Sequence, residues 1–130
     1  MLFRSVGDAV PGVANSVITQ IASSSSPIKL SDRGDVLWKG SFYPVYAQNV
    51  PGQALFLNAD PLISANQVPV GTNLGSQKVV DIYNGANTLH MSANGTYAVV
   101  QVNMQDPPYN FTLQRDNALL FEFSDRKSVV

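Results

Sequence analysis

Few residues in this chain could do acid–base chemistry, and they form no recognisable catalytic set. There is one histidine, His90, and one glutamate, Glu122. A hydrolase would have to combine His90 with aspartates, most of which stand beside Gly, Pro or Asn in predicted turns. Because cysteine is absent, thiolate zinc sites and cysteine nucleophiles are excluded. We therefore expect a non-enzyme without cofactor or metal, and keep a hydrolase built on aspartates and His90 as an alternative.

A second candidate chemistry is ring stacking by aromatic side chains gathered in one short stretch. The stretch contains Trp38, Phe42, Tyr43 and Tyr46. Sugar-binding modules use exposed aromatic rings as stacking platforms, and Phe42 and Tyr46 would share one face of a strand. The four residues are therefore candidates for a glycan or partner strip. The alternative is that they form aromatic core and sheet edge.

Two short motifs have simpler explanations as turns. Arg33-Gly34-Asp35 is the tripeptide of integrin ligands, but three residues carry little information, and a tight turn explains them. Asn94-Gly95-Thr96 fits a glycosylation acceptor, but Asn-Gly between alternating runs is above all a hairpin signal of type I′. We assign neither motif a function.

The composition is unusual in its low charge. Charged residues make up 13% of the chain and the net charge is −1, against roughly 25% charged residues in an average soluble domain. Scattered Lys and Arg disfavour nucleic acid as the main partner, because phosphate neutralisation needs clustered cations. No apolar run is long enough to span a membrane, and the first residues do not resemble a signal peptide. One interpretation is a secreted or viral β protein with a neutral, amide-rich surface, and the other is that much of this surface is interface, where charged residues are depleted.

The elements that would position these residues begin with an apolar stripe near the N-terminus. Its spacing predicts a helix from Pro11 to about Ala22, followed by a Ser-rich break at Ser23–Ser26. One interpretation is a helix that covers the end of the domain. The other is an assembly arm, helical or extended, that docks on a neighbouring subunit. The residues of this arm are Val10, Val13, Val17, Ile18 and Ile21.

The clearest single element is the stretch Asn94–Met104. After its Asn-Gly turn it alternates, with Ala98, Val100, Val102 and Met104 on one face and polar residues on the other. Strands are also predicted at 35–39, 42–48, 53–58, 77–83, 86–92, 111–115 and 118–123. The Asn-Gly pairs predict a three-stranded meander, and Asp116-Asn117 predicts a turn between the last two strands.

About eight short strands predict an all-β protein. We expect an antiparallel β-sandwich or jelly roll at residues 28–130, preceded by an N-terminal arm with a short helix and linker at residues 1–27.

In general character the chain resembles small bacteriophage and viral virion proteins. The shared features are the Ser-rich break at Ser23–Ser26, a cysteine-free Asn/Gln/Ser-rich sandwich and the shortage of catalytic groups. The resemblance implies a structural subunit of a capsid vertex, minor capsid position, decoration, tail or spike. It would be made in the host cytoplasm and would contact itself and other virion proteins. A carbohydrate-binding module that uses exposed aromatics is the alternative.

Overall fold

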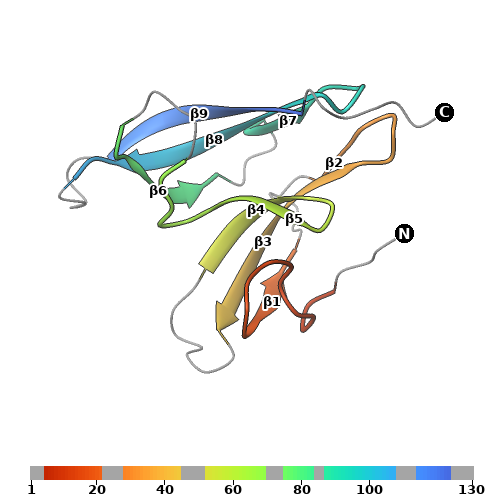
Figure 1. The fold of residues 1–130 in the computed structure, drawn as a ribbon, viewed down its shortest axis with the longest axis horizontal. Helices are drawn as coiled ribbons and strands as arrows, with labels where there is room; N and C mark the ends of the chain where they lie inside the picture. The colour runs from red at the N-terminus through yellow and green to blue at the C-terminus, as the bar shows by residue number, and fades with distance from the viewer. Residues whose placement is uncertain are drawn as a thin grey trace.

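A computed structural model describes residues 5–21, 28–44, 52–69, 75–83, 87–107 and 114–123 (Figure 1). These residues form two antiparallel sheets and no helix, which confirms the predicted all-β class. The first sheet contains β1 (Ser16–Gln20), β2 (Lys29–Leu30), β3 (Val36–Pro44), β4 (Gly52–Leu57) and β5 (Asp60–Ser64). The second contains β6 (Lys78–Ile82), β7 (Leu89–Met91), β8 (Tyr97–Gln105) and β9 (Gln114–Glu122).

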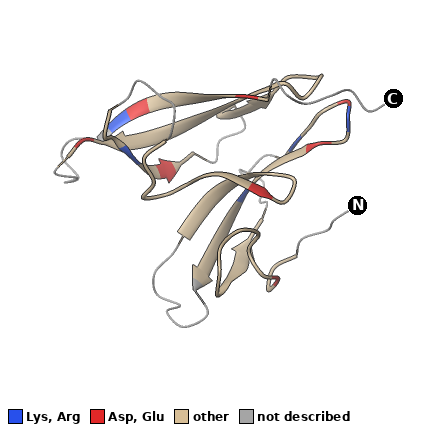
Figure 2. Ribbon diagram, in the orientation of Figure 1, with Lys and Arg blue, Asp and Glu red and all other residues tan. Residues whose placement is uncertain are grey.

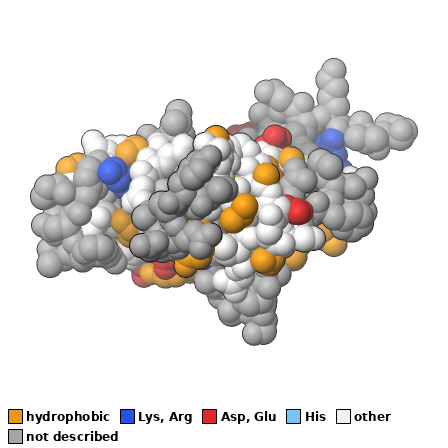
Figure 3. All heavy atoms as spheres, turned by 90° about the horizontal axis from the view of Figure 1, so that it is seen from below, with side chains coloured by type: hydrophobic (Ala, Val, Ile, Leu, Met, Phe, Trp, Pro, Cys, Tyr) orange, Lys and Arg blue, Asp and Glu red, His pale blue; other side chains and the backbone are white. Residues whose placement is uncertain are grey.

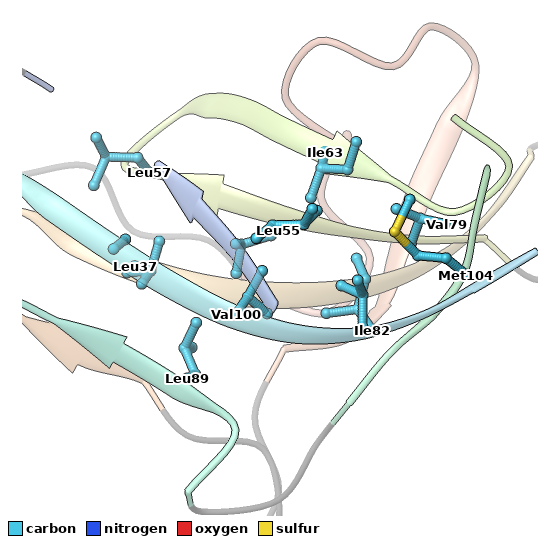
Figure 4. Packing of buried hydrophobic residues seen from close by; sticks show 12 residues of the cluster. Leu37, Leu55, Leu57, Ile63, Val79, Ile82, Leu89, Val100 and Met104 are labelled. Carbon is cyan, nitrogen blue, oxygen red and sulfur yellow. The ribbon is translucent and has the colours of Figure 1, made fainter. Parts of the chain in front are cut away.

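The two sheets pack face to face through one hydrophobic cluster (Figure 4). Leu37, Leu55, Leu57 and Ile63 come from the first sheet, and the second contributes Val79, Ile82, Leu89, Ala98, Val100, Val102, Met104 and Leu119. Burying each large side chain stabilises the fold by roughly 1.5–3 kcal/mol. The arrangement is consistent with a β-sandwich. A jelly roll is not supported by the pairing of the described strands, because each sheet comes from one half of the chain.

The central strand of the second sheet is β8, the element that the sequence specifies best. Its inward residues Ala98, Val100, Val102 and Met104 are at most 1% exposed, as the alternation predicts. Along one side it pairs with β9 without a shift of register. Along its other side it pairs with both β6 and β7.

This pairing corrects the predicted meander. Strands β6 and β7 both run antiparallel to β8, so no hairpin joins them to each other. Residues 84–86, which include the Asn84-Gly85 pair, lie outside the described part of the chain. The other Asn-Gly pair does form the turn before β8, but positive φ is found at Gly95 and not at Asn94. The turn is therefore not type I′.

The predicted turn at Asp116-Asn117 is also wrong, because both residues lie within β9. They pair with Asn103 and Val102 of β8. Asp116 accepts a side-chain hydrogen bond from Asn103, so tertiary contacts use the polar groups that elsewhere favour a turn. Residues 111–113 lie outside the described part of the chain.

In the first sheet, β3 runs unbroken through Gly40-Ser41, where the sequence predicts a break. A Cβ atom on Gly40 would lie 2.9 Å from Trp38 Cζ3 and 3.2 Å from Phe56 Cε2. Glycine at this position therefore makes room for two stacked rings, whose centroids are 4.3 Å apart.

The predicted helix at residues 11–22 is wrong, because Ser16–Gln20 form β1 and pair with β3. Positive φ angles at Gly12 and Asn15 interrupt the helical path, and Val17, Ile18 and Thr19 are β-branched. The apolar stripe nevertheless marks buried positions. A second hydrophobic cluster, on the outer face of the first sheet, contains Val10, Ile18, Trp38, Ala54 and Phe56.

Several strand edges are covered from within the chain. Residues 7–10 bond to the outer edge of β1 through Gly7, Asp8 and Val10. The edge strand β5 contains Pro61 and a register shift, both of which discourage further pairing.

The edge of β6 that faces away from β8 is hydrogen-bonded by residues of the first sheet and by the segment that follows β5. The backbone of Val79 exchanges hydrogen bonds with Asn66 and Gln67. Further along, Ile82 N–H donates to Gln53 Oε1 at 3.1 Å, and Lys39 Nζ donates to the Ile82 carbonyl at 2.6 Å.

Candidate interaction surface

The most distinctive surface is the outer face of the second sheet, opposite the core. Strand β8 presents Tyr97, Val99, Gln101 and Asn103 there, beside Ala118 and Leu120 of β9. We call these six residues the outer face. Tyr97 is 45% exposed and Leu120 is 66% exposed. Val99 lies directly opposite Leu120, and Tyr97 is the next outer-face residue along β8, so these side chains form a small contiguous apolar patch, which is more informative than a single exposed leucine.

A shallow hollow of about 330 Å³ lies across this face, between β7, β8 and β9. Its lining is mostly uncharged: Asn87, Thr88, His90, Val99, Gln101, Asp116, Asn117 and Ala118. The exposed lining of this open hollow is mostly apolar, so it suits contact with a partner surface more than enclosure of a small molecule.

One end of the hollow contains the carboxylate of Asp116, which a residue of β8 and the residue that follows β6 hold in place. The Tyr83 hydroxyl donates to Asp116 Oδ1 at 2.5 Å, and Asn103 Nδ2 donates to the same oxygen at 3.1 Å. The hydrogen bond from Tyr83 lowers the pKa of Asp116, and the same bond raises the pKa of Tyr83. The carboxylate is therefore a fixed hydrogen-bond acceptor for both side chains.

His90 also lines this hollow, and its side chain is exposed. Its Nε2 atom lies 3.1 Å from the Asn87 carbonyl oxygen. Across the described ranges, no three His, Asp or Glu side chains are placed to hold a metal ion. Likewise, no described helix is long and apolar enough to cross a membrane.

The predicted arm residues lie against the first sheet of their own chain. Val10 and Ile18 are buried in the second cluster, and Val13 and Ile21 pack against it. Val17 is half-buried on β1. Residues 1–4 and 22–27, including the Ser-rich break, lie outside the described part, and docking on a neighbour stays a prediction.

The predicted aromatic strip is divided by the fold. Trp38 is only 4% exposed, is stacked on Phe56 and donates from Nε1 to the Asn58 carbonyl at 2.8 Å. Its ring is therefore core and offers no platform to a glycan. Phe42 and Tyr43 are half-buried, and Tyr46 lies outside the described residues.

The Arg33-Gly34-Asp35 turn is tied into the fold. The carboxylate of Asp35 is buried and accepts from Ser31 Oγ and from Asn58 Nδ2, both at 3.1 Å. A side chain bonded in this way is not presented to a receptor.

Two contacts between distant residues were not predicted from the sequence. The pairs Lys39–Ile82 and Tyr83–Asp116 each join segments far apart in sequence. No local spacing marks such pairs, because they depend on how the sheets are placed. The alternation of β8 predicts which of its residues lie on the outer face, but it does not predict whether another segment covers them.

Comparison of the chain with protein-family models, characterised proteins and solved structures finds no match.

Proposed function

We propose that this chain is a non-enzymatic structural subunit of a virion, which works by self-association and by contacts with neighbouring virion proteins. The observation that carries the proposal is the outer face of the second sheet. It exposes Tyr97 and Leu120 on a regular sheet surface. Apolar and aromatic side chains on a preformed surface provide contact area at low entropic cost, as protein interfaces require.

The distribution of charge supports the same proposal. In the described residues, Lys, Arg, Asp and Glu are few and scattered over both sheets (Figure 2). Seen from below, much of the described surface carries uncharged polar groups with separate apolar spots (Figure 3). Interfaces between subunits are depleted in charge, whereas freely soluble monomers rely on charge to avoid association.

The predicted assembly arm is less available for docking on a neighbouring subunit than its sequence suggests. While β1 is paired with β3, Val10 and Ile18 are already buried within the chain. Deleting residues 1–26 would therefore remove a strand and part of a core cluster, and loss of assembly would be ambiguous. A surface substitution is a better test.

The exposed leucines provide a matched pair for that test. Leu120 on β9 and Leu30 on β2 are 66% and 68% exposed, and they lie in different sheets. We expect Leu120→Ser to weaken self-association measured by sedimentation, and to lower incorporation into purified virus particles measured by quantitative mass spectrometry. Leu30→Ser should leave both unchanged. Equal effects of the two substitutions, or absence of the wild-type chain from particles, would contradict the proposal.

The alternative function is a carbohydrate-binding module. Because Trp38 is buried, such a site would have to use Phe42, Tyr43 or Tyr46. A glycan array probed with the wild type and with Tyr43→Ala tests this alternative. Binding that depends on Tyr43 would favour it over the structural role.

A further inference from the structure

Strand β9 differs from the other edges described above. Residues 7–10 cover β1, side chains of the first sheet satisfy β6, and Pro61 and a register shift interrupt β5. In contrast, β9 spans Gln114–Glu122 and contains no proline, glycine or register shift. In the described part of the chain its only strand partner is β8. It lies on the side of β8 away from β6 (Figure 1).

A long, regular edge of this kind is a template for pairing with another strand. Natural proteins usually interrupt such edges with proline, bulges or charges unless pairing is required. The stretch of β9 from Ala118 to Phe121 carries no charge, and the charged residues Arg115, Asp116 and Glu122 stand towards its two ends.

The hydrogen bonds of β8 and β9 fix which residues face the open edge. Phe123 N–H donates to the Thr96 carbonyl at 2.7 Å, so Phe123 directs its backbone toward β8. Successive residues of an antiparallel strand direct their backbone groups to opposite edges. It follows that Asp116, Ala118 and Leu120 direct their N–H and C=O groups to the edge away from β8.

We propose that two copies of the chain pair through β9, antiparallel about a two-fold axis at Ala118, and join their second sheets into one continuous sheet. The proposal rests on the proposed function, for which it supplies the contact that drives self-association. In this register Ala118 faces Ala118 of the second copy, Asp116 faces Leu120, and Gln114 faces Glu122. The two outer faces then form one surface.

Two considerations select this register. Pairing between two identical edges requires that residues whose N–H and C=O groups point to the open edge face each other. This condition allows only every second register. Among these, the register centred on Ala118 uses the whole of β9. The register centred on Leu119 would place Asp116 opposite Glu122, and like charges directly opposite destabilise a strand pair. The register centred on Leu120 would pair only the C-terminal half of the strand.

Cysteine cross-linking tests the register directly, because the chain contains no cysteine. Facing residues in a hydrogen-bonded antiparallel pair have Cα atoms about 5.5 Å apart, within the range of a disulfide. We expect Ala118→Cys to form a disulfide-linked dimer under mild oxidation. Asp116→Cys alone and Leu120→Cys alone should not, because their own copies lie roughly 13 Å apart along the strand. A mixture of these two variants should cross-link.

Leu30→Cys, at an exposed position on β2, is the control for disulfides that form by random collision between copies. Cross-linking of Leu120→Cys with itself, in preference to Ala118→Cys, would overturn the proposed register. Equal yields for Leu30→Cys and Ala118→Cys would overturn pairing through β9.

Proline substitution provides an independent test by sedimentation. Ala118→Pro removes an N–H that faces the open edge and is not used by β8, so the fold is retained. We expect this variant to sediment as one copy with the wild-type circular dichroism spectrum, whereas Ala118→Thr sediments as the wild type. A wild-type mass for Ala118→Pro would overturn pairing through β9 and leave self-association intact. A wild type that is itself monomeric would overturn both proposals.

Discussion

Lys39 Nζ of β3 donates to the Ile82 carbonyl of β6 at 2.6 Å, and this contact ties the first sheet to an edge of the second. Gln53 reinforces it by accepting from Ile82 N–H and by donating to Asp81 Oδ1 at 2.8 Å. The edge of β6 is therefore satisfied from within the chain, whereas β8 is the only strand partner of β9 among the residues that the structure describes. This difference between two edges of one sheet is the reason for proposing that association takes place through β9.

We predict that Lys39→Met destabilises the protein, because it leaves the buried Ile82 carbonyl without this donor. An unsatisfied buried acceptor costs roughly 1–3 kcal/mol, and urea unfolding measures the loss. Lys29→Met on β2 is the control and should change the free energy of unfolding by less than about 0.5 kcal/mol. An increase in stability of Lys39→Met would mean that burying the ammonium costs more than its hydrogen bond contributes.

The same residue predicts a dependence of stability on alkaline pH. Burial lowers the pKa of Lys39, and nearby Asp81 opposes the shift only in part. Between the lowered pKa and the ordinary value, the unfolded chain binds the proton more strongly, so stability rises with pH. The difference in unfolding free energy between wild type and Lys39→Met should therefore be larger at pH 9.5 than at pH 7. A difference that is constant or shrinks with pH would contradict the burial of the ammonium.

A third prediction concerns the carboxylate at the end of the hollow. The hydrogen bond from Tyr83 is the largest cause of the lowered pKa of Asp116. Tyr83→Phe removes this donor, so the pKa of Asp116 should rise, and an NMR titration of the side-chain carboxyl measures it. Tyr97→Phe is the control and should leave that pKa unchanged. Because the folded-state pKa is lowered, any stabilisation by Asp116 is present at neutral pH and disappears as pH falls through the folded-state value.

A fourth prediction uses two glycines with similar backbone angles. Gly95 and Gly75 have φ of +73° and +67°, so alanine at either position costs about 1–2 kcal/mol of backbone strain. A Cβ at Gly95 would also lie 2.8 Å from the buried Asp35 Oδ2, whereas nothing lies within 4 Å at Gly75. Gly95→Ala should therefore cost about 1–3 kcal/mol more than Gly75→Ala. Thermal or urea unfolding of both variants measures the difference, and equal losses would mean that the Asp35 turn does not pack against Gly95.

A fifth prediction tests the assignment of Trp38 to the core. Trp38→Phe loses the bond from Nε1 to the Asn58 carbonyl and part of the stack on Phe56. We expect a loss of about 1–3 kcal/mol in unfolding free energy. Since the chain has a single tryptophan, a blue-shifted fluorescence emission of the wild type reports the same burial. Emission typical of a water-exposed indole would contradict the assignment.

What the sequence predicts well is local. In β8 the alternation of Ala98, Val100, Val102 and Met104 with polar residues is sufficient, because one face of this strand packs on the core along its length. The turn at Gly95 and the burial of Val10 and Ile18 are also encoded by neighbouring residues.

What the sequence does not predict depends on contacts between distant segments. Spacing of three and four residues indicated a helix at residues 11–22, but pairing with β3 made Ser16–Gln20 a strand. Asp116 and Asn117 are typical turn residues that long pairing with β8 holds in a strand. The contact of Lys39 with Ile82 and the exposure of Leu120 follow from sheet packing, which no local pattern specifies.

Sedimentation equilibrium of the 130-residue chain, over a range of concentrations, tests self-association most directly. The proposed structural role predicts an average mass that rises with concentration to at least two copies. A mass that stays at that of one chain, 14.0 kDa, at every concentration up to about 1 mM would contradict it.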